Sequence, residues 1–411
     1  MNRDMVKQID DNMVLLAAPF CLNWDLTDEL KGKRKILIQN RTTEITDFSL
    51  AEADRIEYLQ DLEEVRMIGE GSFFSSEKGD MVYHKSKRGR ISLAFCLGKE
   101  KDVIIPEGVN VIGKEAFRGS EVCSVKFPES LEEIRRGAFC NCIKLRGAKF
   151  GRNLENIEEC VFSGCMKLEV LTFARSEKGK SLKIEDSAFA FCKNLRRVEF
   201  AEGLTVLGRC VFLYCYNLEE ISVPDSVSEF EPLCLAPVKI IRVSRPLIGL
   251  AKAVATSDPR TKRMHYFFRI TYKNKCIVVP ACLYWRIDLV DRRIYDILSD
   301  DEKDGVYDLS DCAGTPIMRR QTALEAFRLG RNKETGAYLK GSWKELIDDV
   351  SADGKEESLI DLLIVFRDGG IQTPEFLKET VRIANKNGWL KAVALALQMT
   401  EEGERETDFV I

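Results

Sequence analysis

Apolar residues between positions 103 and 243 recur in one phrase of nearly constant length. In its clearest copies the phrase reads Ile-x-x-x-Ala-Phe-x-x-Cys-x-x-Leu-x-x-Val-x-Phe. Its first phenylalanine recurs from copy to copy, and a leucine takes its place in the last one: Phe117, Phe139, Phe162, Phe189, Phe212 and Leu235. Successive copies are 22 or 23 residues apart, except for one step of 27 that contains the polar insert 176–180. Such a period predicts a repeat architecture with one coil of chain per copy.

The second half of each copy alternates apolar and polar residues. Val125 with Phe127, and Leu171 with Phe173, are examples of the apolar set. Strict alternation predicts a β-strand with one face inward and one face outward. The outward residues of five copies are the candidate binding residues of this chain: Ser124, Lys126, Lys149, Val170, Thr172, Arg197, Glu199, Glu220 and Ser222. We expect a polar surface, because these residues carry both charge signs, few large apolar groups and no aromatic ladder.

A single copy is too small to bury its own apolar side. Copies must therefore stack strand on strand, about 4.8 Å apart. The repeated phenylalanine then forms a column inside the stack. Roughly 20–29 residues per copy, with leucine or isoleucine at fixed offsets, is the signature of a leucine-rich solenoid. The pattern therefore predicts a leucine-rich solenoid and does not indicate a biochemical activity.

Two stretches resemble the BspA-like leucine-rich repeat family, whose unit is an Ile-Gly-x-x-Ala-Phe-x-x-Cys-x-x-Leu phrase. Residues 112–117 match the first half of that phrase, and residues 188–195 match the second half. Residues 74–83 are similar to the family's inter-repeat hairpin, although here the turn reads Gly79-Asp80 with the acidic residue second. The resemblance covers roughly residues 35–245. It implies a solenoid with ligand-binding surfaces and no single biochemical activity.

The period divides the chain into three parts. Residues 1–34 are expected to cap the first coil, residues 35–245 to form the solenoid with an internal hairpin near 74–95, and residues 246–411 to form a C-terminal α+β and helical region. The short apolar run at 13–22 is interpreted as a strand of the cap. A signal peptide begins with a positively charged stretch, whereas here Asp10 and Asp11 abut the run.

Beyond residue 246 the period is replaced by a hairpin and then by helical spacing. Apolar runs at 266–272 and 276–279 flank Lys273-Asn274-Lys275, which predicts a β-hairpin. Helices are expected at 247–255, 317–329, 343–350, 358–366, 374–387 and 390–399. The last two form a pair loosely similar to an ankyrin-type hairpin, with one copy visible. The predicted fold class is an α+β repeat protein, a solenoid of short stacked strands followed by a β-hairpin and helices.

Composition and charge place the chain among ordinary globular proteins. Hydrophobic residues make up 45% of the 411 residues and charged residues 31%, and the net charge is −4. This balance favours neither nucleic acid nor an anionic membrane as a partner. No apolar run approaches the roughly 18 residues that a transmembrane helix needs, so none is expected.

Most of the 14 cysteines are placed by the repeat. Four lie three residues after the phrase phenylalanine and two lie two residues before it: Cys142, Cys165, Cys192 and Cys215, then Cys160 and Cys210. A cysteine that recurs at one position of a repeat packs there as a small apolar side chain. Zinc is the alternative, but stacked coils would align these sulfurs in a row and no Cys-x-x-Cys pair occurs, so no metal is expected.

No catalytic set emerges from the sequence. The two histidines, His84 and His265, are far apart and are expected in hairpins. Residues 68–73 resemble the glycine-rich loop of protein kinases, but Phe74 replaces the third glycine, and the catalytic His-Arg-Asp and Asp-Phe-Gly motifs do not occur. We interpret this stretch as a turn. The basic cluster 85–90 is expected to be a solvated hairpin tip, with a phosphate or an acidic partner as the alternative.

The sequence therefore predicts a non-enzymatic binding scaffold that uses the outward strand face. The expected partner is another protein, and no cofactor is expected. Unpaired thiols favour a reducing compartment, here the cytoplasm. A secreted or cell-surface adhesin is the first alternative, because the resembled family includes surface proteins. An enzyme housed in the C-terminal region is the second, and a charged pocket between the hairpin and the helices would favour it.

Overall fold

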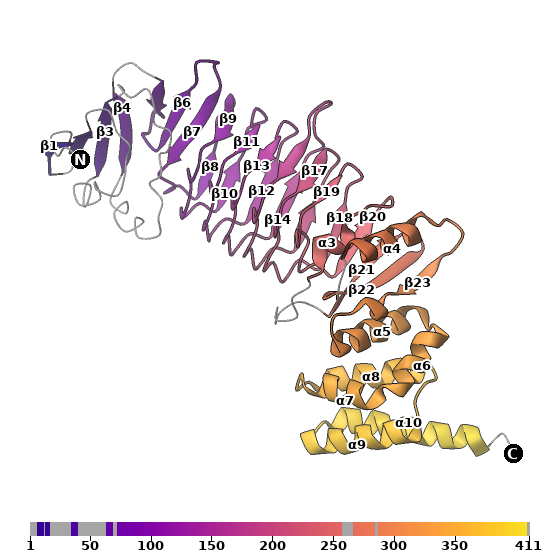
Figure 1. Cartoon of the computed structure of the whole chain (residues 1–411). Coiled ribbons are helices and arrows are strands. Elements are labelled where there is room, and N and C mark those ends of the chain that lie inside the picture. The colour runs from indigo at the N-terminus through magenta and orange to yellow at the C-terminus, as the bar shows by residue number, and fades with distance from the viewer. Residues whose placement is uncertain are drawn as a thin grey trace. The chain divides into compact units, whose positions relative to one another are not determined.

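The computed structural model describes residues 6–11, 13–16, 34–39, 63–68, 72–256, 266–283 and 287–408 (Figure 1). The chain divides into two compact units. The first comprises Met1–Val238 and Arg242–Val254, and the second comprises Lys239–Ile241 and Ala255–Ile411. The first unit holds the stacked coils, and the second holds most of the helices.

Four strands near the N-terminus form a small sheet in the order β1-β2-β3-β4. They are β1 (Val6–Asp10), β2 (Met13–Leu16), β3 (Lys35–Gln39) and β4 (Glu64–Ile68). β1 and β2 are antiparallel, whereas β2, β3 and β4 run parallel. The strand expected within 13–22 is present as β2, and residues 17–22 lie outside the described residues, as do residues 69–71 of the glycine-rich stretch.

One side of the solenoid is a nine-stranded sheet in the order β19-β17-β15-β13-β11-β9-β7-β6-β5. Its first strands, β5 (Phe73–Ser75), β6 (Met81–Lys85) and β7 (Ile91–Cys96), form an antiparallel meander. Each later coil adds one parallel strand: β9 (Val109–Ile112), β11 (Glu133–Ile134), β13 (Asn156–Ile157), β15 (Leu182–Ile184), β17 (Leu204–Leu207) and β19 (Glu229–Phe230). The sequence pattern predicts one strand per copy, and the structure adds this second one at the phrase isoleucine.

The other side carries the strands that the alternating pattern predicts. They are β8 (Asp102–Ile104), β10 (Ser124–Lys126), β12 (Gly147–Phe150), β14 (Val170–Phe173), β16 (Arg197–Glu199), β18 (Glu220–Val223) and β20 (Ile240–Val243). β12, β14 and β16 pair parallel and in register, so that Gly147, Val170 and Arg197 are aligned. Ala148, Leu171 and Val198 point inward and are buried, which confirms the predicted alternation.

The phrase phenylalanines form the expected column inside the first unit. The ring centroids of Phe117, Phe139, Phe162, Phe189 and Phe212 follow one another at 4.6, 5.0, 5.3 and 5.8 Å, and the rings are nearly parallel. All five side chains are fully buried. A second column meets the first edge-on, formed by the strand-end rings Phe127, Phe150, Phe173 and Phe200. Coils 1 to 6 are numbered here by the members of the first column, from Phe117 to Leu235.

Each coil turns sharply around its column residue, and in coils 1 to 5 the turn uses two left-handed residues. The first lies two positions before the phenylalanine and the second two positions after it. The first position holds Glu115, Gly137, Cys160, Ser187, Cys210 and Leu233, with φ between 55° and 62°. Cys160 and Cys210 are therefore half-buried turn residues, whereas the pattern suggested small core side chains.

Backbone hydrogen bonds join these turns from coil to coil. The N–H of Phe139 donates to the carbonyl of Val161 at 2.8 Å, and that of Phe162 donates to Ala188 at 2.7 Å. At the end of the stack, two N–H groups of coil 6 donate to carbonyls of the helix α3 (Leu250–Val254). Leu233 donates to Lys252 at 3.0 Å and Leu235 donates to Ala253 at 2.9 Å, so α3 takes the place of a further coil.

The four cysteines that follow the phenylalanine form a ladder of their own. Each thiol donates to the carbonyl of the phenylalanine one coil earlier, as Cys142 does to Phe117 at 3.0 Å and Cys165 to Phe139 at 3.2 Å. Cys192 and Cys215 repeat the contact at 3.2 Å. Burial raises the pKa of the Cys142 thiol to about 12. The Cys142 thiol therefore remains protonated, and all four thiols serve as donors in addition to filling space.

The second unit begins with a hairpin and a parallel third strand. β21 (Phe267–Tyr272) and β22 (Lys275–Pro280) are antiparallel, and β23 (Gly305–Asp308) runs parallel to β22. The helix α4 (Ile287–Ser299) and a short 3-10 turn, Ser310–Cys312, flank β23 in sequence. Lys275, expected in the turn, begins β22 and is only 3% exposed. Its ammonium group donates to the carbonyls of Ile297 at 2.6 Å and of Asp300, which satisfies the C-terminal end of α4.

Six further helices follow as three successive hairpins. They are α5 (Pro316–Gly330) with α6 (Lys333–Gly341), α7 (Trp343–Ser351) with α8 (Glu356–Asp368), and α9 (Pro374–Asn387) with α10 (Leu390–Asp408). Thr315 and Thr373 cap α5 and α9 in the same way, each accepting from an N–H three residues later at 3.3 and 3.2 Å. The single hairpin visible in the sequence is thus the last of three.

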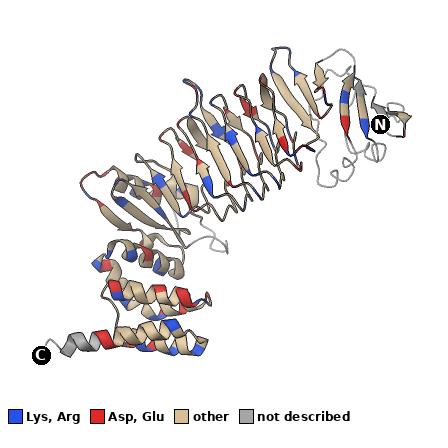
Figure 2. Ribbon diagram, turned by 180° about the vertical axis from the view of Figure 1, so that it is seen from behind, with Lys and Arg blue, Asp and Glu red and all other residues tan. Residues whose placement is uncertain are grey.

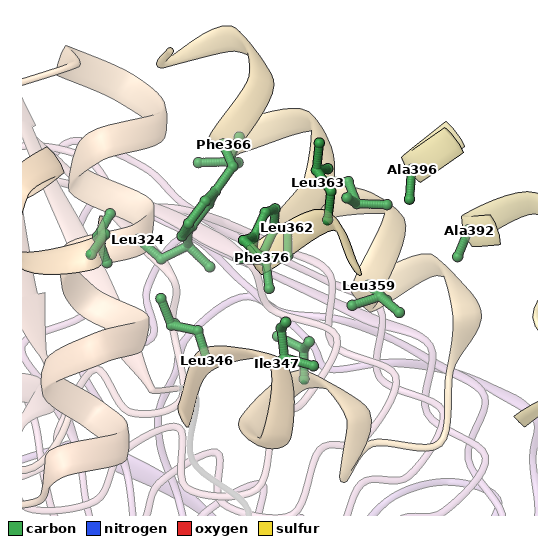
Figure 3. Close-up of a cluster of buried hydrophobic side chains, with 14 of the residues drawn as sticks. Leu324, Leu346, Ile347, Leu359, Leu362, Leu363, Phe366, Phe376, Ala392 and Ala396 are labelled. Atoms are coloured by element: carbon green, nitrogen blue, oxygen red, sulfur yellow. The ribbon is translucent and has the colours of Figure 1, made fainter. Parts of the chain in front are cut away.

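One apolar core joins these hairpins (Figure 3). Leu324 from α5, Leu346 from α7, Phe366 from α8 and Phe376 from α9 all point into it. The rings of Phe366 and Phe376 stack at 4.4 Å. A bidentate ion pair also joins α5 to α7, with Arg320 donating to Asp349 at 2.6 and 2.8 Å.

Candidate binding face

The predicted strand-face residues lie in two parallel rows. The first row contains Ser124, Val170, Arg197 and Glu220, and the second contains Lys126, Lys149, Thr172, Glu199 and Ser222. The register aligns Lys149 with Thr172 and Glu199 on β12, β14 and β16. All nine side chains are exposed or half-buried. The structure thus brings the predicted residues together on one face of the first unit.

Local ion pairs and hydrogen bonds order the middle and the end of this face. Arg197 pairs with Glu199 on the same strand, and the hydroxyl of Thr172 donates to Glu199 at 3.0 Å. Arg242 reaches back one coil to Glu220 and donates to its second carboxylate oxygen at 3.1 Å. Exposed pairs of this kind stabilise a fold by less than about 1 kcal/mol, so they position charges more than they stabilise the coils.

Lys126 and Lys149 differ from the rest of the face. They lie in the same row on β10 and β12, and a hydrogen bond from the N–H of Arg146 to the carbonyl of Cys123 at 3.1 Å links the two coils. Within the described part of the chain neither ammonium group contacts a carboxylate. Two neighbouring positive charges without a counter-charge make this end of the face attractive to an anionic group.

Three residues of the strand face are missing from the set that the sequence predicts. Asp102 and Ile104 extend the rows onto β8, where Asp102 aligns with Ser124 and Ile104 with Lys126. Arg242 continues the second row on β20. Their phase in the alternating pattern is the signal that would have found them. Ile104 is 68% exposed, so with Val170 at 39% the face also carries two aliphatic contacts. Figure 2 shows how basic and acidic residues alternate along the coils.

The described side chains that could support catalysis or metal binding pack within the fold or lie apart from one another. His84 lies in the β6–β7 hairpin, as expected, with its ring 4.7 Å from that of Phe73, and burial lowers its pKa. His265 is outside the described residues. Across the described ranges, no three side chains of His, Cys, Asp or Glu gather in a way that could hold a metal ion. None of the helices described is long and apolar enough to cross a membrane.

The two-ladder coil with its internal phenylalanine column defines a leucine-rich repeat β-solenoid. The BspA type leucine rich repeat region matches this chain in six copies, over residues 30–120, 91–178 and 178–244. The chain therefore belongs to that family, which confirms the resemblance seen in residues 112–117 and 188–195.

Solved structures with similarity to the chain are bacterial leucine-rich repeat proteins. One is a leucine rich cell surface protein from Faecalibacterium prausnitzii, with 25% identity and a TM-score of 0.37 over 52% of this chain and 48% of that one. Another is a leucine-rich repeat protein from Eubacterium ventriosum, with 18% identity and a TM-score of 0.36 over 48% and 57%. The chain thus spans about half the length of these proteins. No curated protein matches it.

Proposed function

We propose that this protein is a non-enzymatic scaffold that binds another protein through the strand face. One observation carries the proposal: five adjacent coils hold exposed polar residues in two aligned rows, while the residues between them are fixed in the core. Rigid strands place these groups at about 4.8 Å intervals, which suits recognition by many small polar contacts. Such a face binds with moderate affinity, because it lacks the buried aromatic anchors of tight interfaces.

A charge exchange on β16 tests the strand face. In Arg197→Glu with Glu199→Lys, the net charge and the possibility of an internal ion pair are both kept. We expect this double variant to lose at least tenfold in affinity for the main protein that the full-length wild type captures from extracts of its native cells. Captured proteins are identified by mass spectrometry, and the affinity is then measured with the purified partner.

The opposite sheet offers a matched control. Lys183 and Glu185 form an ion pair at 3.4 Å with the same two-residue spacing, in the same coil. The exchange Lys183→Glu with Glu185→Lys is expected to leave the affinity unchanged. Equal capture by wild type and both variants would remove the strand face as the binding surface.

We also propose that the scaffold works in the cytoplasm. No disulfide joins the described cysteines, and burial raises the pKa of core thiols such as Cys142 and Cys165, which fits a reducing compartment. Fractionation of the native cells checks this proposal. Recovery of the protein only from the cell surface or the medium would favour an adhesin; the similar protein from Faecalibacterium prausnitzii is described as a cell surface protein.

A further inference from the structure

A second exposed surface runs along the turns of coils 2 to 5. It consists of Ile143, Met166, Phe191 and Tyr214, one from each coil, and is called the turn strip here. These side chains are 52%, 40%, 43% and 37% exposed. They lie two or four residues after the phrase phenylalanine, on either side of the buried cysteine, and so are separate from the strand face. Apolar side chains that gather on a surface in this way mark interaction sites.

The backbone conformation is unfavourable for the two aromatic members of the strip. Phe191 and Tyr214 occupy the second left-handed position of the turn, with φ of 62° and 65°. In coils 1 and 3 the same position holds Gly119 and Gly164, the residue type that adopts this conformation without strain. A bulky side chain is disfavoured there, and neither ring is compensated by full burial. A strained backbone conformation that is not offset by full burial of its side chain is typical of binding sites.

The aromatic rings of the turn strip contact one another on coils 4 and 5. The centroids of Phe191 and Tyr214 are 4.7 Å apart, and Tyr216 continues from Tyr214 at 5.9 Å. Met166 and Ile143 are exposed apolar residues of the two preceding coils. Aromatic residues and methionine are the types enriched where proteins meet.

The charges beside the turn strip are lysines. Lys167 and Lys193 are exposed and contact no carboxylate of the described residues, while Lys144 pairs with Glu121 at 2.7 Å. An occupant with carboxylates on its flank would neutralise Lys167 and Lys193. The strip therefore combines an apolar line with a positive border on the same coils.

The spacing between coils indicates which secondary structure of a partner fits along the turn strip. The phenylalanine column advances by 4.6–5.8 Å per coil. One turn of an α-helix advances by about 5.4 Å, so a helix lying along the axis would present one residue to each coil. We propose that the turn strip binds an amphipathic α-helix of a partner protein, with apolar residues at i, i+3 or i+4, and i+7, and with acidic residues beside them.

Glycine substitutions test this proposal, because they remove the rings and relieve the backbone together. The full-length chain and its Phe191→Gly, Tyr214→Gly double variant are used to select from a displayed library of 18-residue helical peptides. We expect selection on the wild type to enrich peptides with leucine-like residues at helical spacing and flanking glutamate or aspartate. These peptides should bind the double variant at least tenfold more weakly, while its melting temperature stays equal or rises.

A control variant separates the turn strip from the strand face. Ile104→Ser removes a side chain that is more exposed than any member of the strip, and it should leave peptide affinity unchanged. The proposal is overturned if no enriched peptide distinguishes the wild type from the double variant. Enrichment of basic peptides or of peptides without helical spacing would also overturn it. So would a lower melting temperature of the double variant, or self-association of the wild type that the double variant abolishes.

Discussion

Phe189→Ala is expected to lower the free energy of unfolding of the solenoid by about 3–5 kcal/mol. The side chain is fully buried between the rings of Phe162 at 5.3 Å and Phe212 at 5.8 Å. Both neighbours are held by their own coils, so the cavity cannot collapse easily, and the stacking contacts on two sides are lost. Urea unfolding followed by circular dichroism measures the loss as a shift of the midpoint.

The same coil supplies the control for this measurement. Phe191 lies two residues further on and is 43% exposed, so Phe191→Ala should change the free energy of unfolding by less than about 0.5 kcal/mol. Equal losses for the two variants would mean that the column does not form the core, and the stacked-coil account would fail.

Raising the pH from 8 to 10 in the presence of a reductant is expected to destabilise the first unit strongly. Burial raises the pKa of Cys96 and Cys142 to about 12 from an ordinary value of 9.0. It also raises the pKa of Cys165, Cys192 and Cys234. The unfolded chain therefore releases thiol protons that the folded chain keeps, and stability falls as pH rises above 9. The loss is on the order of 1 kcal/mol per thiol over this interval.

Removing one thiol isolates its share of the pH effect. Cys142→Ala should show a loss between pH 8 and pH 10 that is smaller than that of the wild type by on the order of 1 kcal/mol. Lysine and tyrosine titrations are common to both proteins and cancel in the difference. Urea midpoints of the two proteins across this pH range supply the measurement, and parallel curves would contradict a buried, protonated Cys142.

The solenoid could be predicted because the same pattern of inward and outward residues is repeated in every copy. Each copy fixes the same inward positions, so the place of Phe189 in the column follows from the period once the coils stack. The strand face follows from the same alternation, which extends without change to Asp102 and Arg242. What the period cannot give is the conformation of the turn. Aromatic residues such as Phe191 disfavour a left-handed backbone, and only glycine in the same phase of other coils signals it.

The second unit was predicted less completely because its signals are local and weaker. Pro374 and Gly388 bound α9 at the expected residues, since the cap types are distinctive. The helix α6 also starts at a distinctive cap, Asn332, but it is short and contains Gly336, a residue that normally weakens a helix. The structure gives the reason for this glycine: a side chain there would meet the ring of Phe327 at 2.8 Å. Close packing between residues that are apart in sequence overrides the low helix propensity of glycine. The sequence alone does not reveal such packing.

The helix α3 gives the stack a definite end. Its carbonyls accept the last coil's donors, so the number of copies is set by where this terminator begins and not by any property of the copies themselves. A chain with one more 23-residue copy inserted after coil 3 would keep both of its ends intact. Lineages could therefore lengthen or shorten the array by gene duplication or deletion, acquiring new recognition area without redesigning the fold.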